Sequence, residues 1–182
     1  MKPSTKQKIY IAIILLLIAV CAQFYFSYYY QPRHEIEVYY NQDHALNDEI
    51  IKQIREADKF VYFAVYTFTR ADIEQALLAA KYRGLLVVGL TDKDQYNSLE
   101  QQRKLIDNLK KAGIPVHEQD HSGIMHTKVL VTDKAYASGS YNWTAAATNI
   151  NDEVLEVGRD PALRQKYQNI LEEMFEHYRT DR

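Results

Sequence analysis

The fold is decided by the stretch His126-Thr127-Lys128-Val129-Leu130-Val131-Thr132-Asp133, followed shortly by Gly139-Ser140-Tyr141-Asn142. The apolar run in this stretch predicts a strand over residues 125–132. Successive side chains of a strand point to opposite faces, so His126 and Lys128 are expected on the same face. Thr127, Val129 and Val131 are then expected on the other face, where a core buries them.

The same stretch combines the parts that phosphodiester cleavage needs. A histidine beside a fixed ammonium group and an amide can attack a phosphoryl centre while the charge is held in place. His126 would supply the nucleophile, Lys128 the cation, and Ser140 and Asn142 the hydrogen-bond donors. A lone His-x-Lys is more simply a core strand with an incidental histidine, but the further residues favour a site.

Outward from this stretch, apolar spacing predicts an alternation of strands and helices. Strands are expected at residues 36–40, 59–66, 85–91, 115–118, 125–132, 135–138 and 153–157. Helices with one apolar face are expected at residues 46–57, 73–80, 105–112 and 163–178. The expected fold is therefore α/β, with a mixed sheet flanked by helices in one domain.

All four expected helices carry capping signals, and Asp43 is a plausible cap for the first of them. Thr69 and Ser98 each stand three residues before a residue that can complete a capping box. Asp160, followed by Pro161, predicts the start of the last helix, because proline favours the first helical position.

The N-terminal part of the chain has a different composition. Residues 9–32 carry no charge, and their apolar stretch is about as long as a helix that crosses a membrane. Lysines precede the stretch and glutamates follow it, so the positive-inside rule places residues 1–8 in the cytoplasm and residues 33–182 outside. Residues 33–182 are long enough for one domain.

Two interpretations of residues 9–32 remain open. Val20-Cys21-Ala22 can serve as the cleavage site of a signal peptide, which would leave the domain secreted or periplasmic. The aromatic residues Phe24–Phe26 and Tyr28–Tyr30 are typical of a belt at the outer membrane interface, and they favour an uncleaved anchor.

The charge of the expected domain limits its partners. The chain has 22 basic and 24 acidic residues; three lysines precede the apolar stretch, so 19 basic residues remain against 24 acidic ones. A net charge of about −5 argues against a broad electrostatic grip on duplex DNA. The single cysteine, Cys21, lies in the apolar stretch, which excludes a disulfide or zinc–thiolate site in the domain.

The motif resembles the HKD signature of the phospholipase D superfamily; it reads His126-x-Lys128-x4-Asp133, then Gly139-Ser140-x-Asn142. The order of elements over nearly the whole domain is similar to the small, single-motif bacterial nucleases of this superfamily and to their mitochondrial, membrane-anchored relatives. The chain departs from the pattern in one place: five residues separate Asp133 from Gly139, where the family usually has six.

The resemblance implies a metal-independent phosphodiesterase without a cofactor, which forms a phosphohistidine intermediate. It also implies a second histidine, which protonates the leaving oxygen and later helps to activate water. His126 is the only histidine of this chain with a lysine two positions on. A second copy therefore has to supply the second motif, and a homodimer with one shared site is expected.

By this resemblance, His126 of one protomer is the nucleophile and His126 of the other is the general acid. Lys128 from both chains neutralises the phosphoryl oxygens, and Ser140 and Asn142 complete the phosphate-binding set. Glu153 matches the acidic residue that holds the histidine and fixes its tautomer. Its alternative interpretation is a carboxylate at a sheet edge.

The remaining candidates have weaker signals. Asp133 is a catalytic candidate by its match to the motif, but its position at the end of a strand favours the stabilisation of a turn. Phe68 is a candidate for base stacking, and its alternative is a core or rim aromatic. The histidines and aspartate of residues 117–126 have no familiar metal-ligand spacing, so no metal site is expected.

The sequence thus predicts a metal-independent nuclease that prefers single strands, anchored to a bacterial cytoplasmic membrane with its domain on the periplasmic or exoplasmic side. The alternative is a phospholipase D-type enzyme that hydrolyses or transfers lipid headgroups, supported by the membrane segment and by the same chemistry. The residues of the site do not separate DNA, RNA and lipid.

Overall fold

The computed structural model describes residues 4–29, 36–43 and 45–179. The chain divides into two compact units, residues 1–34 and 35–182. The predicted boundary between residues 32 and 33 lies outside the described residues. The first unit contains helix α1 (Thr5–Tyr29).

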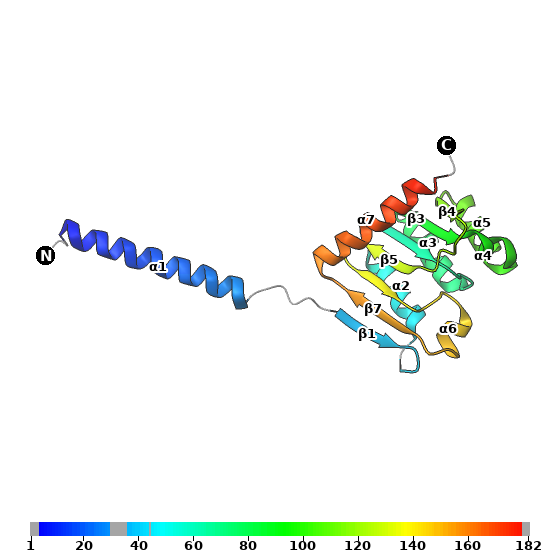
Figure 1. Cartoon of the computed structure of the whole chain (residues 1–182), viewed down its shortest axis with the longest axis horizontal. Helices are drawn as coiled ribbons and strands as arrows, with labels where there is room; N and C mark the ends of the chain where they lie inside the picture. The colour runs from blue at the N-terminus through cyan, green and yellow to red at the C-terminus, as the bar shows by residue number, and fades with distance from the viewer. Residues whose placement is uncertain (1–3, 30–35, 44, 180–182) are drawn as a thin grey trace. The chain divides into compact units, whose positions relative to one another are not determined.

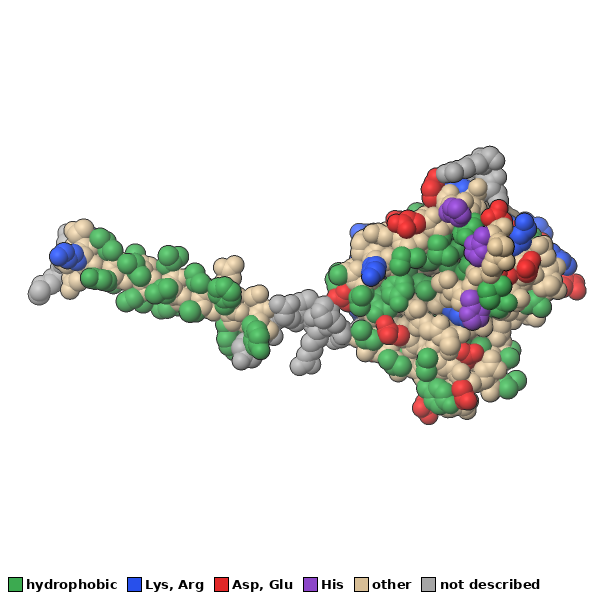
Figure 2. All heavy atoms as spheres, viewed as in Figure 1, with side chains coloured by type: hydrophobic (Ala, Val, Ile, Leu, Met, Phe, Trp, Pro, Cys, Tyr) green, Lys and Arg blue, Asp and Glu red, His purple; other side chains and the backbone are tan. Residues whose placement is uncertain are grey.

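Helix α1 is long and apolar enough over Thr5–Tyr28 to cross a membrane, with a mean hydropathy of 2.5. Figure 2 shows hydrophobic side chains along its length and basic ones near its N-terminal end. A signal sequence near the N-terminus has the same properties. Both predicted interpretations of this segment are therefore consistent with the helix.

The second unit is built on one mixed sheet, as predicted. Its strands run in the order β1-β7-β6-β5-β2-β3-β4. β2, β3 and β4 pair in parallel, whereas β5 pairs antiparallel to β2 and the pairs from β5 through β6 and β7 to β1 are also antiparallel. The strands are β1 (Ile36–Tyr40), β2 (Phe60–Val65), β3 (Leu86–Asp92), β4 (Val116–Gln119), β5 (Lys128–Thr132), β6 (Tyr136–Gly139) and β7 (Val154–Gly158).

Helices cover both faces of this sheet (Figure 1). One buried cluster joins α2, α3 and α5 to one face, and a second cluster joins α7 to the other face. The helices of this unit are α2 (Leu46–Glu56), α3 (Ala71–Tyr82), α4 (Lys93–Ser98), α5 (Glu100–Lys111), α6 (Ala145–Asn149) and α7 (Pro161–His177). The predicted α/β class with flanking helices is confirmed.

Strand β2 shows why the sheet is buried on both faces. Val61, Phe63 and Val65 belong to the cluster of α2, α3 and α5, while the alternate residues Tyr62 and Ala64 belong to the cluster of α7. A strand covered on both faces is apolar at nearly every position.

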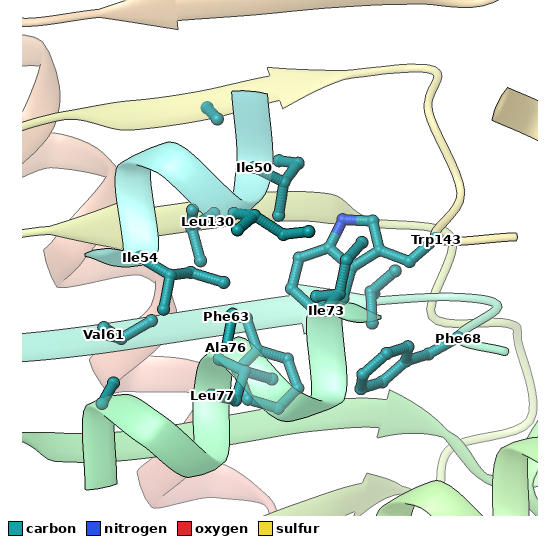
Figure 3. Packing of buried hydrophobic residues seen from close by; sticks show 14 of the residues in the cluster. Ile50, Ile54, Val61, Phe63, Phe68, Ile73, Ala76, Leu77, Leu130 and Trp143 are labelled. Carbon is teal, nitrogen blue, oxygen red and sulfur yellow. The ribbon is translucent and has the colours of Figure 1, made fainter. Parts of the chain in front are cut away.

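Phe63 lies among the side chains in Figure 3, near Phe68 and Trp143. Its ring occupies the space beside Gly89 of β3, where a Cβ would lie 2.1 Å from the ring's Cζ. This close approach requires a glycine at position 89, because any larger residue would displace a fully buried aromatic ring.

The predicted helix starts were partly wrong. Asp160 caps α7 as predicted, since its side chain accepts a hydrogen bond from the N–H of Leu163. Helix α5 instead follows Leu99, because Ser98 ends α4 and its hydroxyl donates to the carbonyl of Asp94. Helix α3 follows Arg70, without a side-chain cap.

Candidate functional site

The candidate site lies where β2 and β3 end and β5 begins. The antiparallel pairing of β5 with β2 places Lys128 opposite Val65 at this edge of the sheet. The carboxyl ends of parallel strands are the edge where α/β proteins usually bind ligands. Hydrogen bonds join the loops there: the N–H of Tyr66 donates to the carbonyl of Thr127 at 2.9 Å, and the N–H of Trp143 to that of Thr67 at 3.0 Å.

His126 and Lys128 meet at this edge, although the predicted strand begins later than expected. β5 starts at Lys128, so His126 lies in the extended segment just before it, with its side chain exposed. The side chain of Lys128 is buried, and its Nζ donates to the carbonyl oxygen of His126 at 2.9 Å. The ammonium group is thus held at the backbone of the residue that carries the exposed imidazole.

Two opposing effects act on the pKa of Lys128, and the pKa is lowered overall. Burial lowers the pKa of Lys128 below its usual value, whereas the nearby carboxylate of Glu153 raises it. The Nζ also lies 5.3 Å from the centroid of the Tyr66 ring, whose face attracts cations. The ring of Tyr66 stands edge-on to that of His126, with centroids 4.9 Å apart.

Ser140 and Glu153 form one hydrogen-bonded unit next to this pair. The Ser140 hydroxyl donates to Oε2 of Glu153 at 2.5 Å and accepts from the N–H of Val154 at 3.2 Å. Oε1 of Glu153 accepts from the amide of Asn151 at 3.1 Å. Glu153 is buried, and within this chain it is bonded to Ser140 and Asn151. That it holds the imidazole of His126 stays a prediction.

Asn142 reaches the site from the loop after β6. Its side-chain oxygen accepts a hydrogen bond from the N–H of Thr67 at 3.3 Å, which fixes the amide plane. The amide nitrogen makes no hydrogen bond to the part of the chain that the structure describes. Its two N–H groups are therefore available to a ligand.

Asp133 is separated from these residues by the length of β5. Its Oδ1 accepts from the N–H groups of Asp58 and Lys59 at 3.0 and 3.1 Å, at the start of β2. Burial acts to raise the pKa of Asp133, but these backbone donors hold it below its usual value. The aspartate thus fixes the far end of the β2–β5 pair, and this position does not support contact with the reacting group.

The candidate role of Phe68 in base stacking was wrong. Phe68 is fully buried and packs edge-on against Trp143, with ring centroids 5.0 Å apart (Figure 3). Its ring continues the core of α2, α3 and α5, so neither of its faces is open to a base. The core interpretation is the one the structure supports. Among the described residues, no three His, Cys, Asp or Glu side chains converge as metal ligands do.

Sequence patterns missed three residues that support the site: Tyr66, Asp92 and Gln102. Asp92 and Gln102 are buried polar residues. Gln102 accepts from the N–H of Phe68 at 2.9 Å and donates to the carbonyl of Tyr66 at 3.2 Å. One of them, Asp92, could have been found from the sequence, because it is a charged residue at the end of an otherwise mostly apolar strand.

The chain is similar to known proteins over most of its length. Residues 50–175 match the family model described as "Cardiolipin synthase, PLD-like domain". Relatives include proteins named "Mitochondrial cardiolipin hydrolase" from Xenopus tropicalis, 32% identical over 67% of this chain, and "Phospholipase D" from Rickettsia conorii, 34% identical over 65% of this chain. The alignments span 57% and 58% of those two relatives.

Two solved structures share the fold over most of their own length. The phospholipase D family member Nuc from Salmonella typhimurium matches with a TM-score of 0.75 and 26% identity, over 80% of this chain and 96% of that one. NucT from Helicobacter pylori matches with a TM-score of 0.69 and 28% identity, over 78% and 97% of the two chains.

Proposed function

The chain belongs to the phospholipase D superfamily, and we propose that it is a metal-independent phosphodiesterase with His126 as its nucleophile. The observation that carries this proposal is the arrangement at the sheet edge. The buried ammonium group of Lys128 is bonded to the backbone carbonyl of His126, and both this group and the exposed imidazole lie against the ring of Tyr66. The free amide N–H groups of Asn142 project from the adjoining loop. These are the nucleophile, the cation and the donors that phosphoryl transfer needs.

The proposed reaction has two steps. A ring nitrogen of His126 attacks phosphorus, and the bond from phosphorus to the leaving oxygen breaks as that oxygen takes a proton from His126 of the partner subunit. Water then attacks the phosphohistidine, gives its proton to the partner's His126, and the bond from phosphorus to nitrogen breaks. Lys128 holds the negative charge of the phosphoryl oxygens in both steps.

The second histidine is the reason to propose a homodimer. The chain holds one HKD motif, and a two-fold axis that brings two copies of the sheet edge together would complete the site. The exposed position of His126 is compatible with such a shared site.

We propose nucleic acid, preferably single-stranded, as the substrate. The chain is similar to Nuc and NucT over nearly their entire length, and a narrow site between two protomers suits a flexible single strand better than a duplex. The net negative charge of the domain agrees, because duplex binding relies on broad phosphate neutralisation.

A phospholipid is the second candidate substrate. The relatives from Xenopus and Rickettsia are named for lipid hydrolysis, and helix α1 is suited to hold the enzyme at a membrane. With α1 as an uncleaved anchor, the proposed location is a bacterial cytoplasmic membrane, with the domain on the periplasmic or exoplasmic side.

The substrate is tested with the full chain in detergent micelles and excess EDTA. Single-stranded DNA, duplex DNA, RNA and phospholipid vesicles are incubated separately, and the products are separated by electrophoresis or thin-layer chromatography. We expect single-stranded nucleic acid to be cleaved fastest. Release of lipid headgroups without any nucleic-acid cleavage would favour the second candidate, and loss of all cleavage in EDTA would contradict the metal-free mechanism.

A second prediction concerns the pH dependence of cleavage. Lys128 has to be charged to bind the phosphoryl group, so the rate should fall as the pH rises through the pKa of Lys128, which burial lowers. Glu153→Gln removes the charge that raises this pKa, and the fall should therefore begin at a lower pH. Lys128→Arg should remove the fall, because arginine stays charged.

The control for this profile is Glu156→Gln. Glu156 lies in β7, the strand that begins directly after Glu153. Its carboxylate accepts from the Tyr136 hydroxyl at 2.7 Å, and it is not among the groups that shift the pKa of Lys128. Its rate profile should match that of the wild type. An alkaline limb that stays in place in Glu153→Gln would show that Glu153 does not set the charge of Lys128.

A further inference from the structure

We propose that the buried carboxylate of Asp92 is a positioning residue that holds His126 through two arms, one along the backbone and one through the ring of Tyr66. This inference rests on the proposed function, because it assigns the residues that fix the nucleophile. Asp92 ends β3, and its side chain is 1% exposed. Each of its two oxygens accepts a different hydrogen bond.

The first arm fixes the backbone ahead of His126. Oδ2 of Asp92 accepts from the N–H of Met125 at 2.9 Å. The side chain of Met125 is itself buried in the cluster beneath α7. The residue before the nucleophile is thus held by its main chain and by its side chain, although it lies outside any strand.

The second arm reaches the other side of the imidazole. Oδ1 of Asp92 accepts from the N–H of Gln95 at 2.9 Å and caps the short helix α4. The amide of Gln95 then donates to the Tyr66 hydroxyl at 3.1 Å and accepts from the Thr67 hydroxyl at 3.1 Å. Gln95 therefore orients the residue whose ring faces His126.

The ring of Tyr66 is the part of the second arm that contacts His126. It lies edge-on to the imidazole at 62° and 4.9 Å, and Lys128 sits over its face. An exposed histidine on a loop would otherwise sample several rotamers. A misplacement of about 1 Å can lower a rate about a hundredfold, so a wall that limits the imidazole to one orientation has a direct kinetic effect.

The two arms require a carboxylate at position 92. Both of its hydrogen-bond partners are backbone N–H donors, and a carboxylate accepts at both oxygens. An asparagine would turn an NH2 group towards one of these donors. One arm would be lost, and a buried N–H group would be left without a partner.

The test uses the full chain in micelles and EDTA, with bis(p-nitrophenyl) phosphate as the probe. Asp92→Asn and Tyr66→Leu should each lower kcat by about 10- to 100-fold and change KM by less than about threefold. Tyr66→Phe, which keeps the ring and loses only the bond to Gln95, should show a smaller loss. The matched control is Tyr96→Phe, which removes a tyrosine hydrogen bond to Asp107 at 2.7 Å on the neighbouring helices.

A second readout does not depend on activity. In NMR spectra of protein with 13C-labelled histidine, the ring protons of His126 should show a ring-current shift from Tyr66. The shift should disappear in Tyr66→Leu, and the signal should broaden or split in Asp92→Asn. If the wild type cleaves nothing, the proposed function fails while this readout still tests the positioning.

Unchanged His126 signals together with an unchanged kcat in Asp92→Asn and Tyr66→Leu would overturn the proposal. If Asp92→Asn does not fold, Gln95→Leu takes its place, because Gln95 is only half-buried and its loss breaks the second arm alone. It should reproduce the kinetic loss of Tyr66→Phe; wild-type values for both variants would refute the second arm.

Discussion

Replacing His126 by alanine is expected to lower the rate of metal-independent phosphodiester cleavage by at least about four orders of magnitude. In the proposed dimer, the substitution removes the nucleophile from one chain and the general acid from the other. The side chain is exposed, so its removal leaves no cavity in the core. Thermal unfolding should therefore be the same as in the wild type, while initial rates in EDTA with single-stranded DNA fall to the detection limit.

His177→Ala is the matched control for this substitution. His177 lies in the last turn of α7 and is also exposed, so its variant should keep the wild-type rate. A His126→Ala protein that cleaves at the wild-type rate would show that His126 is not the nucleophile. Activity of a contaminating metal-dependent nuclease would be recognised because EDTA abolishes it.

The sheet was predictable from the sequence because burial leaves a clear pattern. Strands covered on both faces are apolar throughout, as in Phe60–Val65, and each was predicted to within a few residues. Helix starts were less predictable, since local capping signals compete. Ser98 has the features of an N-cap, but Asp92 starts α4 earlier and Ser98 becomes the last residue of that helix.

From residue spacing alone, the candidate site was predictable only where its residues are close in sequence, whereas Asn142 and Glu153 were predicted from the family resemblance. His126 and Lys128 are two positions apart, and backbone geometry alone brings them together. Tyr66 and Asp92 come from the ends of β2 and β3, so their contact with the motif depends on the order of strands in the sheet. Phe68 follows Tyr66 by two residues and yet turns into the core, where it packs against Trp143.

Mixing wild-type chains with His126→Ala chains is expected to lower the activity more than simple dilution does. If one site needs His126 from both protomers, only dimers of two wild-type chains are active. At equal amounts, about one quarter of randomly formed dimers meet this condition, so the activity per wild-type chain should fall by about half. With three variant chains for each wild-type chain, the activity per wild-type chain should fall to about one quarter, which is about one sixteenth of the activity of the same total amount of wild-type protein.

The measurement requires chains that exchange freely. Wild-type and variant proteins with different affinity tags are mixed in detergent, and formation of mixed dimers is followed by purification on both tags in turn. Mixing with His177→Ala chains is the control, because these should form active dimers and leave the total activity unchanged. Light scattering, corrected for the bound detergent, gives the mass of the protein and so tells whether it is a dimer.

A total activity that falls with the square of the wild-type fraction, at constant total protein, would distinguish a shared site from two independent ones. Sites that each work within a single chain would keep the activity per wild-type chain constant at every ratio, and a monomer that cleaves at the full rate would contradict the shared site directly. The structure gives a physical reason to expect the square law. Lys128 and Glu153 are buried and already bonded within their own chain, whereas the exposed His126 faces solvent with no second histidine of the same motif in its own sequence. In the proposed mechanism, the proton for the leaving oxygen comes from the other chain, so the rate should depend on both chains.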